Sequence, residues 1–208
     1  MRLSPVPAFF HKSFAEAIDA TDVQGRITHA SVLCVEACRL ACTILLGLLE
    51  ETSEDESCEE RKKKVLHEGF LPNGADASDE RLKYTTKAVI ALRDGAYKEM
   101  RVEEIRTSGF VIHSLEAALW ALWKASSYEE VSLIRPRKQP EIHGHYLQGM
   151  FLLLPLGEDV DTVCAIYGQF AGALYGVEAI PSQWIDALQR RDLLDEIFEP
   201  LVEKALKR

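Results

Sequence analysis

The sequence has little positive charge, and this limits the partners that it can bind. Its 24 Lys and Arg residues are outnumbered by 33 Asp and Glu residues, which gives a formal net charge of -9. Bulk attraction to nucleic acid or to an anionic membrane requires the opposite balance. We therefore expect neither nucleic acid nor a membrane as a partner. A small phosphate-bearing ligand remains compatible, because a local site can differ from the net charge.

Other absences bear on the compartment and on the class of fold. The five cysteines are an odd number and lack the spacing of a small disulfide-rich scaffold, so we expect an intracellular protein, cytoplasmic or nuclear. The first residues contain an apolar patch but no extended leader, and no stretch is expected to reach the length of a membrane span. No segment alternates convincingly between apolar and polar residues, so the sequence gives no signal for β-strands.

Apolar residues instead recur every three or four positions, which predicts helices. The clearest segment is residues 28–51, which we interpret as a buried core helix. Turn-forming residues in 70–78 predict a loop, and apolar stripes in 84–92 and 111–122 predict two further helices. A chain of 208 residues with 47% hydrophobic content is long enough to enclose one core, so we expect a single domain.

A further helix is predicted from about Thr162 to Tyr175, and its glycines are unusual. Gly168, Gly172 and Gly176 are four residues apart and therefore lie along one face. Glycine inside a helix costs about 1 kcal/mol relative to alanine. We expect the compensation to be a close approach of another helix to this face.

The turn before this helix contains two acidic residues and a hydroxyl. Asp159 and Asp161 flank one residue, and Thr162 follows at once. Carboxylate and hydroxyl oxygens are suitable ligands for magnesium, manganese or calcium, and a cation would offset the repulsion between the two charges. By spacing alone, the commoner interpretation is helix capping, because acids and threonine at a helix start bind free backbone N–H groups.

The longer sequence around this turn resembles a known family. The run from Gly157 to Thr162, with the motifs that follow it as far as Trp184, is similar to the C-terminal metal motif of ADP-ribosylglycohydrolases. The matching motifs are Gly168-Gln169, Gly172-Ala173, Tyr175-Gly176 and Ile180-Pro181, preceded in the same order by Met1-Arg2, Pro5-Val6, Thr28-His29 and the stretch from Ser108 to Ala121. The resemblance covers nearly the whole chain.

This resemblance implies a compact all-α domain of orthogonally packed helices and a magnesium-dependent hydrolase. Its substrate would be an ADP-ribosylated protein or an ADP-ribose derivative, cleaved at an N- or O-glycosidic bond. Asp159, Asp161 and Thr162 match the ligands of two magnesium ions, for which manganese is a possible substitute, and the two aspartates match catalytic positions. Arg2 and His29 match substrate-binding positions. We expect a monomer.

The sequence also departs from the family pattern. The family has an earlier Gly-Asp segment and a Thr-Asp-Asp motif that supplies further metal ligands, and neither is present in residues 1–208. We therefore expect one N-terminally truncated domain with an incomplete metal site. The alternatives are an inactive ADP-ribose-binding or regulatory remnant and a truncated gene-model product. The sequence does not identify the acceptor residue of the substrate.

A second departure is local. Residues 131–148 interrupt a place where the family passes quickly from a helix into the acidic turn, and we predict an irregular insertion there. Its first residues, Val-Ser, and its last, Leu-Gln, can be encoded by the two ends of an intron. We hypothesise that this segment is a retained intron translated as protein.

Overall fold

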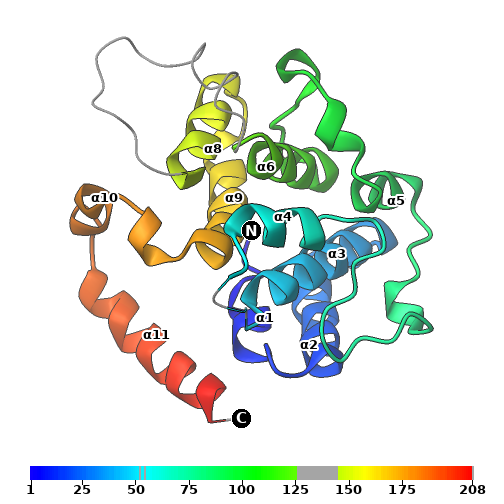
Figure 1. Ribbon diagram of the computed structural model, residues 1–208, viewed down its shortest axis with the longest axis horizontal. Coiled ribbons are helices and arrows are strands. Elements are labelled where there is room, and N and C mark those ends of the chain that lie inside the picture. Colours follow the sequence, from blue (N-terminus) through cyan, green and yellow to red (C-terminus); the bar gives the residue numbers. More distant parts are fainter. Residues whose placement is uncertain (52, 54, 126–144, 208) are drawn as a thin grey trace.

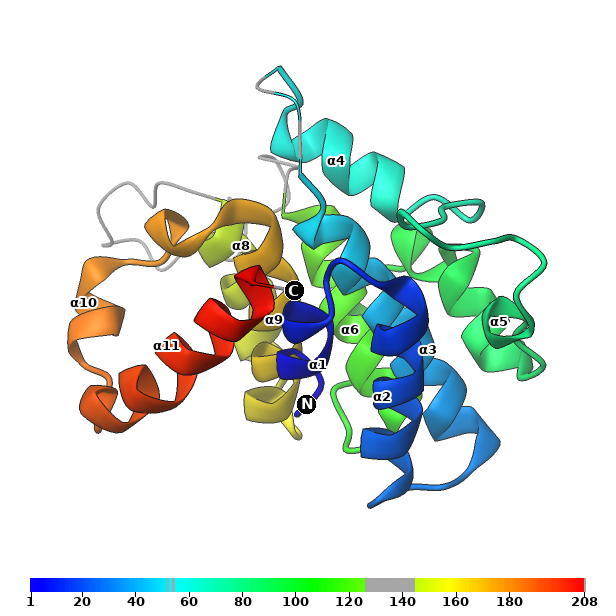
Figure 2. The same cartoon turned by 90° about the horizontal axis from the view of Figure 1, so that it is seen from below.

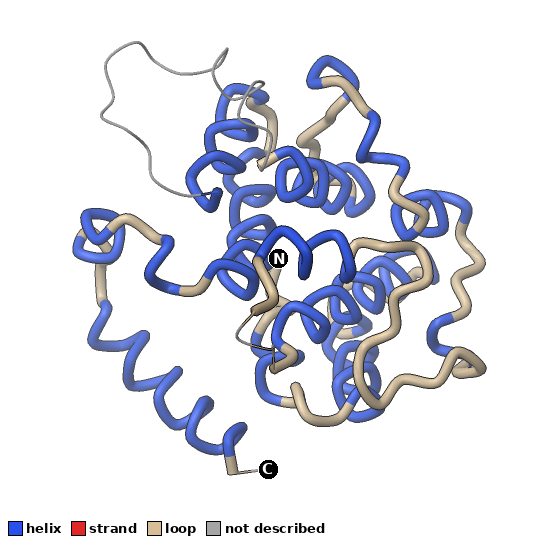
Figure 3. The backbone as a smooth tube through the Cα atoms, viewed as in Figure 1, coloured by secondary structure: helices blue, strands red, loops and turns tan. Residues whose placement is uncertain are grey.

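A computed structural model of the chain describes residues 1–51, 53, 55–125 and 145–207. Within these residues the backbone forms α-helices and short 3₁₀ helices, and no β-strand (Figure 3). The predicted all-α fold is therefore confirmed.

The α-helices are labelled in Figure 1. The first half contains α1 (Pro5–Phe9), α2 (Phe14–Arg26), α3 (Val32–Leu49), α4 (Cys58–Val65), η1 (Glu80–Leu82), α5 (Lys87–Arg93), η2 (Ala96–Glu99) and η3 (Val102–Glu104). The second half contains α6 (Val111–Lys124), α8 (His145–Leu153), η4 (Leu154–Leu156), α9 (Val160–Tyr175), η5 (Val177–Ala179), α10 (Ser182–Asp186) and α11 (Arg191–Leu206).

Helix α3 occupies the centre of the domain and contacts α1, α2, α4, α5, α6 and α9. It begins at a cap in which the Ser31 hydroxyl accepts from the backbone N–H of Cys34. Its 18 residues are long and apolar enough to cross a membrane, which the sequence prediction did not expect, but 67% of that window is buried inside the protein. A core helix of a soluble protein passes the same test, so this length is weak evidence for a membrane span.

Helices α6, α8 and α9 pack against one another in the second half of the domain. The closest approach is at Gly149 of α8, where an added Cβ would lie 2.2 Å from the ring of Tyr167 in α9. The Tyr167 hydroxyl donates to the carbonyl of Tyr146 at 2.9 Å and also lies 3.1 Å from that of His145. One tyrosine therefore fills the space over a glycine and binds the first turn of α8.

The predicted close packing along the glycine face of α9 is wrong for most of that face. An added Cβ at Gly168 would lie 3.4 Å from the Tyr146 hydroxyl, but at Gly172 and Gly176 it would meet no atom of the described residues within 4 Å. Gly176 ends the helix with a φ of 76°, which favours glycine for its backbone conformation. The glycines in tight contact are instead Gly149 and Gly47 of α3. Close packing at a glycine depends on the helix or loop that lies opposite it, and not on the spacing between glycines.

The two C-terminal helices extend along the side of the domain (Figure 2). Helix α11 contacts α1, and the Lys12 ammonium donates to the carbonyl of Leu206 at 3.0 Å. Most apolar residues of α11 remain partly or largely exposed, and of its sixteen residues only Ala205 is buried.

The predicted insertion at 131–148 is only partly described. Residues 131–144 lie outside the described residues. Residues 145–148 form the first turn of α8, with Tyr146, Leu147 and Gln148 buried, so these four are helical and not irregular as predicted. Apolar contacts with α9 favour the helix here.

Candidate functional site

The acidic turn lies at the start of α9 and is held by the segment that precedes α6. Gly157 and Glu158 have φ values of 71° and 52°, so the chain passes through two left-handed residues before the helix. The Thr107 hydroxyl donates to the carbonyl of Gly157 at 2.7 Å, and the backbone N–H of Asp159 donates to the carbonyl of Thr107 at 2.9 Å. These two bonds hold the backbone at a position that is costly for a non-glycine residue such as Glu158.

The two carboxylates of this turn have no partners among the described residues. Asp159 occupies the N-cap position of α9, but its side chain makes no capping hydrogen bond. Asp161 is in the first turn of the helix and is exposed, and Thr162 is half-buried beside it. The Asp159 side chain therefore does not cap the helix. The carboxylate oxygens of Asp159 and Asp161 have no cation or hydrogen-bond donor as partner among the described residues.

A short loop, Thr107 to Phe110, lies against the carboxylate of Asp159. An added Cβ at Gly109 would lie 3.3 Å from Asp159 Oδ2, so a larger residue at position 109 would press on the carboxylate. In the same loop the Ser108 hydroxyl forms a 2.7 Å hydrogen bond with Nδ1 of His113. No role was predicted for this loop, although Ser108 and Gly109 stand just before a predicted helix.

The charges around the turn are arranged unevenly. Arg106 pairs with Glu158 at 3.4 Å, and both side chains are largely exposed. Burial raises the pKa of the Cys164 thiol, and the negative charge of Asp161 raises it further. Burial also raises the pKa of Glu116 on α6. Arg106 therefore forms an ion pair with Glu158. In the described part of the chain, no cation pairs with the negative charges of Asp159 and Asp161.

These residues fit a divalent cation bound through oxygen. Two carboxylates and one hydroxyl in a single turn are hard ligands, and the hydrogen bonds from Thr107 fix the backbone that bears them. Magnesium requires about six oxygen atoms. Asp159, Asp161 and Thr162 can supply three side chains, so the remaining oxygens would come from water, from a ligand or from other residues.

The two predicted substrate-binding residues lie together, near the junction of α2 and α3. Arg2 Nη2 is 3.5 Å from the Thr28 hydroxyl, and the adjacent His29 donates its backbone N–H to the carbonyl of Gly25 at 3.0 Å. Both side chains are exposed. In the described residues no hydrogen bond or ion pair joins them to the acidic turn.

A glutamine on α9 connects the two groups indirectly. Gln169 donates through Nε2 to the carbonyl of Met1 at 2.6 Å and accepts at Oε1 from the backbone N–H of Ser4 at 3.0 Å. It therefore attaches the segment that carries Arg2 to α9. Gln169 is eight residues after Asp161, roughly 12 Å along the helix.

Comparison with known proteins identifies the family of the chain. The sequence matches the ADP-ribosylglycohydrolase family model over residues 1–208. The chain belongs to this family. The all-α fold of this ADP-ribosylglycohydrolase chain is the one that the resemblance of the sequence implied.

Three relatives align with almost all of this ADP-ribosylglycohydrolase chain. "ADP-ribosylarginine hydrolase Tri1" of Serratia proteamaculans is 29% identical over 201 residues, which are 97% of this chain and 44% of the relative. The protein of the same name from Pseudomonas putida is 24% identical over 99% of this chain and 45% of its own length. An uncharacterized protein of Archaeoglobus fulgidus is 25% identical over 98% of this chain and 56% of its own length. The chain thus spans about half the length of the relatives that it matches.

Proposed function

We propose that the chain acts as a magnesium-dependent hydrolase that cleaves ADP-ribose from an ADP-ribosylated protein or a related derivative. The observation that carries this proposal is the acidic turn, where Asp159, Asp161 and Thr162 present oxygen ligands without described partners. Membership of the ADP-ribosylglycohydrolase family supports it. Manganese is a suitable substitute for magnesium, because both cations prefer oxygen ligands.

The three side chains of the turn would hold the cation, and the loop behind them would keep them in place. A bound magnesium ion would polarise oxygen atoms and orient the ribose hydroxyls and a water molecule. A carboxylate of the turn, Asp159 or Asp161, would accept a proton from the attacking water at the anomeric carbon. Thr107 contributes by fixing the backbone of the turn, and Gly109 contributes by leaving room for Asp159.

The acceptor that we propose is an arginine side chain. Two relatives that align with 97% and 99% of this chain are named ADP-ribosylarginine hydrolases, which favours the N-glycosidic bond to arginine. Arg2 and His29 are exposed near the start of α3, and we propose that they contact the substrate. The guanidinium of Arg2 has the geometry and charge to bind a phosphate group.

A second candidate is ADP-ribose binding without turnover, as an inactive or regulatory protein. One observation favours it: among the described residues no group of three or more His, Cys, Asp or Glu side chains could hold a metal ion. The turn alone supplies three ligands, one of them a threonine hydroxyl, and a magnesium site built from so few side chains binds weakly unless ligand or water completes it.

The experiment that separates the two candidates measures release of ADP-ribose from ADP-ribosylated arginine by the purified chain, with magnesium and with excess chelator. We expect release only with magnesium. Asp159→Ala and Asp161→Ala should each lower the rate by about 100-fold or more, since removing even an outer-shell support of a metal ligand costs 10–100-fold. Asp186→Ala, an exposed aspartate on α10, is the matched control and should leave the rate unchanged.

Calorimetry with ADP-ribose, with and without magnesium, completes the test. Binding that needs magnesium and both aspartates, without turnover, would favour the second candidate. Equal hydrolysis by the wild type and both alanine variants, or hydrolysis in excess chelator, would refute the role of the acidic turn.

A further inference from the structure

A cavity lies between α3, the loop after α4, the segment around η1, and α5 with η2. Its volume is about 220 Å³. None of its lining residues belongs to the acidic turn, to α9 or to the loop Thr107 to Phe110. It is therefore separate from the proposed catalytic site.

The walls of the cavity are mostly apolar. They include Leu40 and Ile44 from α3, Leu66 and Phe70 from the loop after α4, and Leu92 from α5. The Phe70 ring lies over Gly47, where an added Cβ would be 2.3 Å from it. Because Gly47 has no side chain, the Phe70 ring packs directly against it. Phe70 therefore forms a wall of the cavity and does not fill it.

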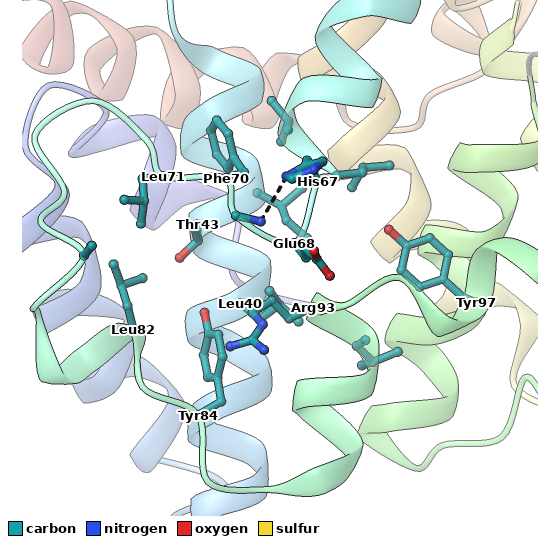
Figure 4. A pocket seen from close by; sticks show the side chains of 16 residues that line it. Leu40, Thr43, His67, Glu68, Phe70, Leu71, Leu82, Tyr84, Arg93 and Tyr97 are labelled. Atoms are coloured by element: carbon teal, nitrogen blue, oxygen red, sulfur yellow. Dashed lines mark hydrogen bonds between the residues drawn. The ribbon is translucent and has the colours of Figure 1, made fainter.

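One side of the cavity carries a cation and two hydroxyl groups. Figure 4 shows the Arg93 guanidinium beside the Tyr84 ring, with the Tyr84 hydroxyl directed towards Thr43. Asp94 Oδ1 accepts from Arg93 Nε at 2.7 Å and pairs with Nη2 at 2.6 Å, which leaves Nη1 without a partner among the described residues. Burial raises the pKa of Tyr84 to about 12, so its hydroxyl stays protonated, and it is hydrogen-bonded to the Thr43 side chain.

A tyrosine hydroxyl without a protein partner faces the cavity. Tyr97 is only 1% exposed, and within the described residues its hydroxyl forms no hydrogen bond. The hydroxyl points to the side of the cavity that carries His67 and Glu68 (Figure 4). Burial raises the pKa of this tyrosine, so the hydroxyl is a neutral donor at physiological pH. This hydroxyl is not among the fully buried polar atoms that lack a partner in the described residues, so it is open to the cavity, where a ligand with an acceptor can bind it.

The size of the cavity limits the ligand. An apolar cavity of roughly 150 Å³ accommodates benzene. A volume of about 220 Å³ has room for a benzene ring with a short polar substituent. The apolar walls favour the ring, Arg93 favours a carboxylate, and Tyr97 favours a hydrogen-bond acceptor on the same molecule.

We propose that this cavity binds a small aromatic carboxylic acid that carries a hydroxyl group on the ring. The carboxylate binds Arg93 Nη1. The ring lies between Leu40, Ile44 and Phe70, and the ring hydroxyl accepts from Tyr97. This site is independent of the proposed hydrolysis.

The test uses 4-hydroxyphenylacetate as the probe and two matched molecules, phenylacetate without the hydroxyl and 4-methylphenol without the carboxylate. Ligand-observed NMR titration of the whole chain should give a Kd on the order of 1 mM for the first probe. Arg93→Gln should weaken both acids about tenfold and leave 4-methylphenol unchanged, because it removes a charge-assisted bond. Tyr97→Phe should weaken only the two probes that carry a hydroxyl, by about fivefold.

Two further variants guard against loss of folding. Ala77→Trp, at an exposed lining position, should fill the cavity and abolish binding of all three probes while circular dichroism stays unchanged. Arg101→Gln, an exposed arginine outside the lining, should bind all three like the wild type. No binding by the wild type, unchanged binding by Ala77→Trp, or equal effects of Arg93→Gln on acids and 4-methylphenol would overturn the proposal.

Discussion

Two acidic regions of this protein are built in opposite ways. Glu36, on α3, is 4% exposed, and its carboxylate accepts from the Thr85 backbone N–H at 2.8 Å, the Thr85 hydroxyl at 2.7 Å and the Thr86 backbone N–H at 2.9 Å. It therefore binds the backbone just before α5. Asp159 and Asp161 lie at the start of α9 and have no described hydrogen bond or ion pair.

The comparison separates a carboxylate that stabilises the fold from carboxylates that are available to a ligand. Burial alone would raise the pKa of Glu36, but the hydrogen bonds from Thr85 and Thr86 outweigh it and lower the pKa to about 2. All of its oxygen atoms are engaged by the protein. The acidic turn instead uses its hydrogen bonds on the backbone, through Thr107, and leaves its side-chain oxygens available.

Glu36→Gln is expected to have the largest effect on stability. It should lower the free energy of unfolding by about 2 kcal/mol at pH 7, because charge-assisted hydrogen bonds to buried backbone donors are replaced by weaker ones. The folded pKa of about 2 lies below the ordinary value of 4.5. The contribution of Glu36 is therefore complete above about pH 5 and is lost as the pH falls towards 2. Urea unfolding at several pH values should show the variant approaching the wild type in acid.

Asp161→Asn is the control for this comparison and should leave the free energy of unfolding unchanged at pH 7. A loss of stability as large as that of Glu36→Gln would show that Asp161 is structural, which would remove the contrast between the two regions.

An intermediate effect is expected for Thr107→Val, which keeps the shape of a 1% exposed side chain and removes the hydroxyl bound to the carbonyl of Gly157. We expect a loss of about 1 kcal/mol of stability. The affinity for magnesium should also fall several-fold, because the turn is held less firmly. Thermal unfolding and a magnesium titration measure the two effects, and a change in stability without a change in affinity would separate the loop from the site.

The smallest effect is expected from magnesium itself. A cation that binds only the folded state, at a concentration equal to its Kd, stabilises by about 0.4 kcal/mol. Thermal unfolding should therefore shift upwards slightly with magnesium in the wild type and not in Asp159→Asn/Asp161→Asn. An equal shift in the double variant would mean that the ion binds elsewhere.

Much of the fold could be predicted because helical periodicity is a local property of the sequence. The core helix predicted at 28–51 is α3, Val32–Leu49, and the helix predicted at Thr162–Tyr175 is α9, Val160–Tyr175. The stripe in 111–122 became α6, and the predicted loop at 70–78 is without helix. These predictions needed only the spacing of apolar and turn-forming residues.

What the sequence could not supply depends on contacts between distant segments. The acidic turn was predicted as a local cluster, but the support from Thr107 and Gly109 joins residues about fifty positions apart. The cavity beside Arg93 is lined by four separate segments, so no motif marks it. The predicted close packing on the glycine face of α9 was wrong for the same reason. The spacing of glycines does not show which helix, if any, lies opposite that face.

The contact between Gly149 and Tyr167 has a consequence for how this family can diverge. Because Tyr167 fits over the glycine and binds the first carbonyls of α8, the register between α8 and α9 is fixed from the α9 side. Relatives can therefore differ in length between α6 and α8 while this pair of helices keeps its alignment. Positions 149 and 167, by contrast, should change together in evolution, with a larger residue at one compensated by a smaller one at the other.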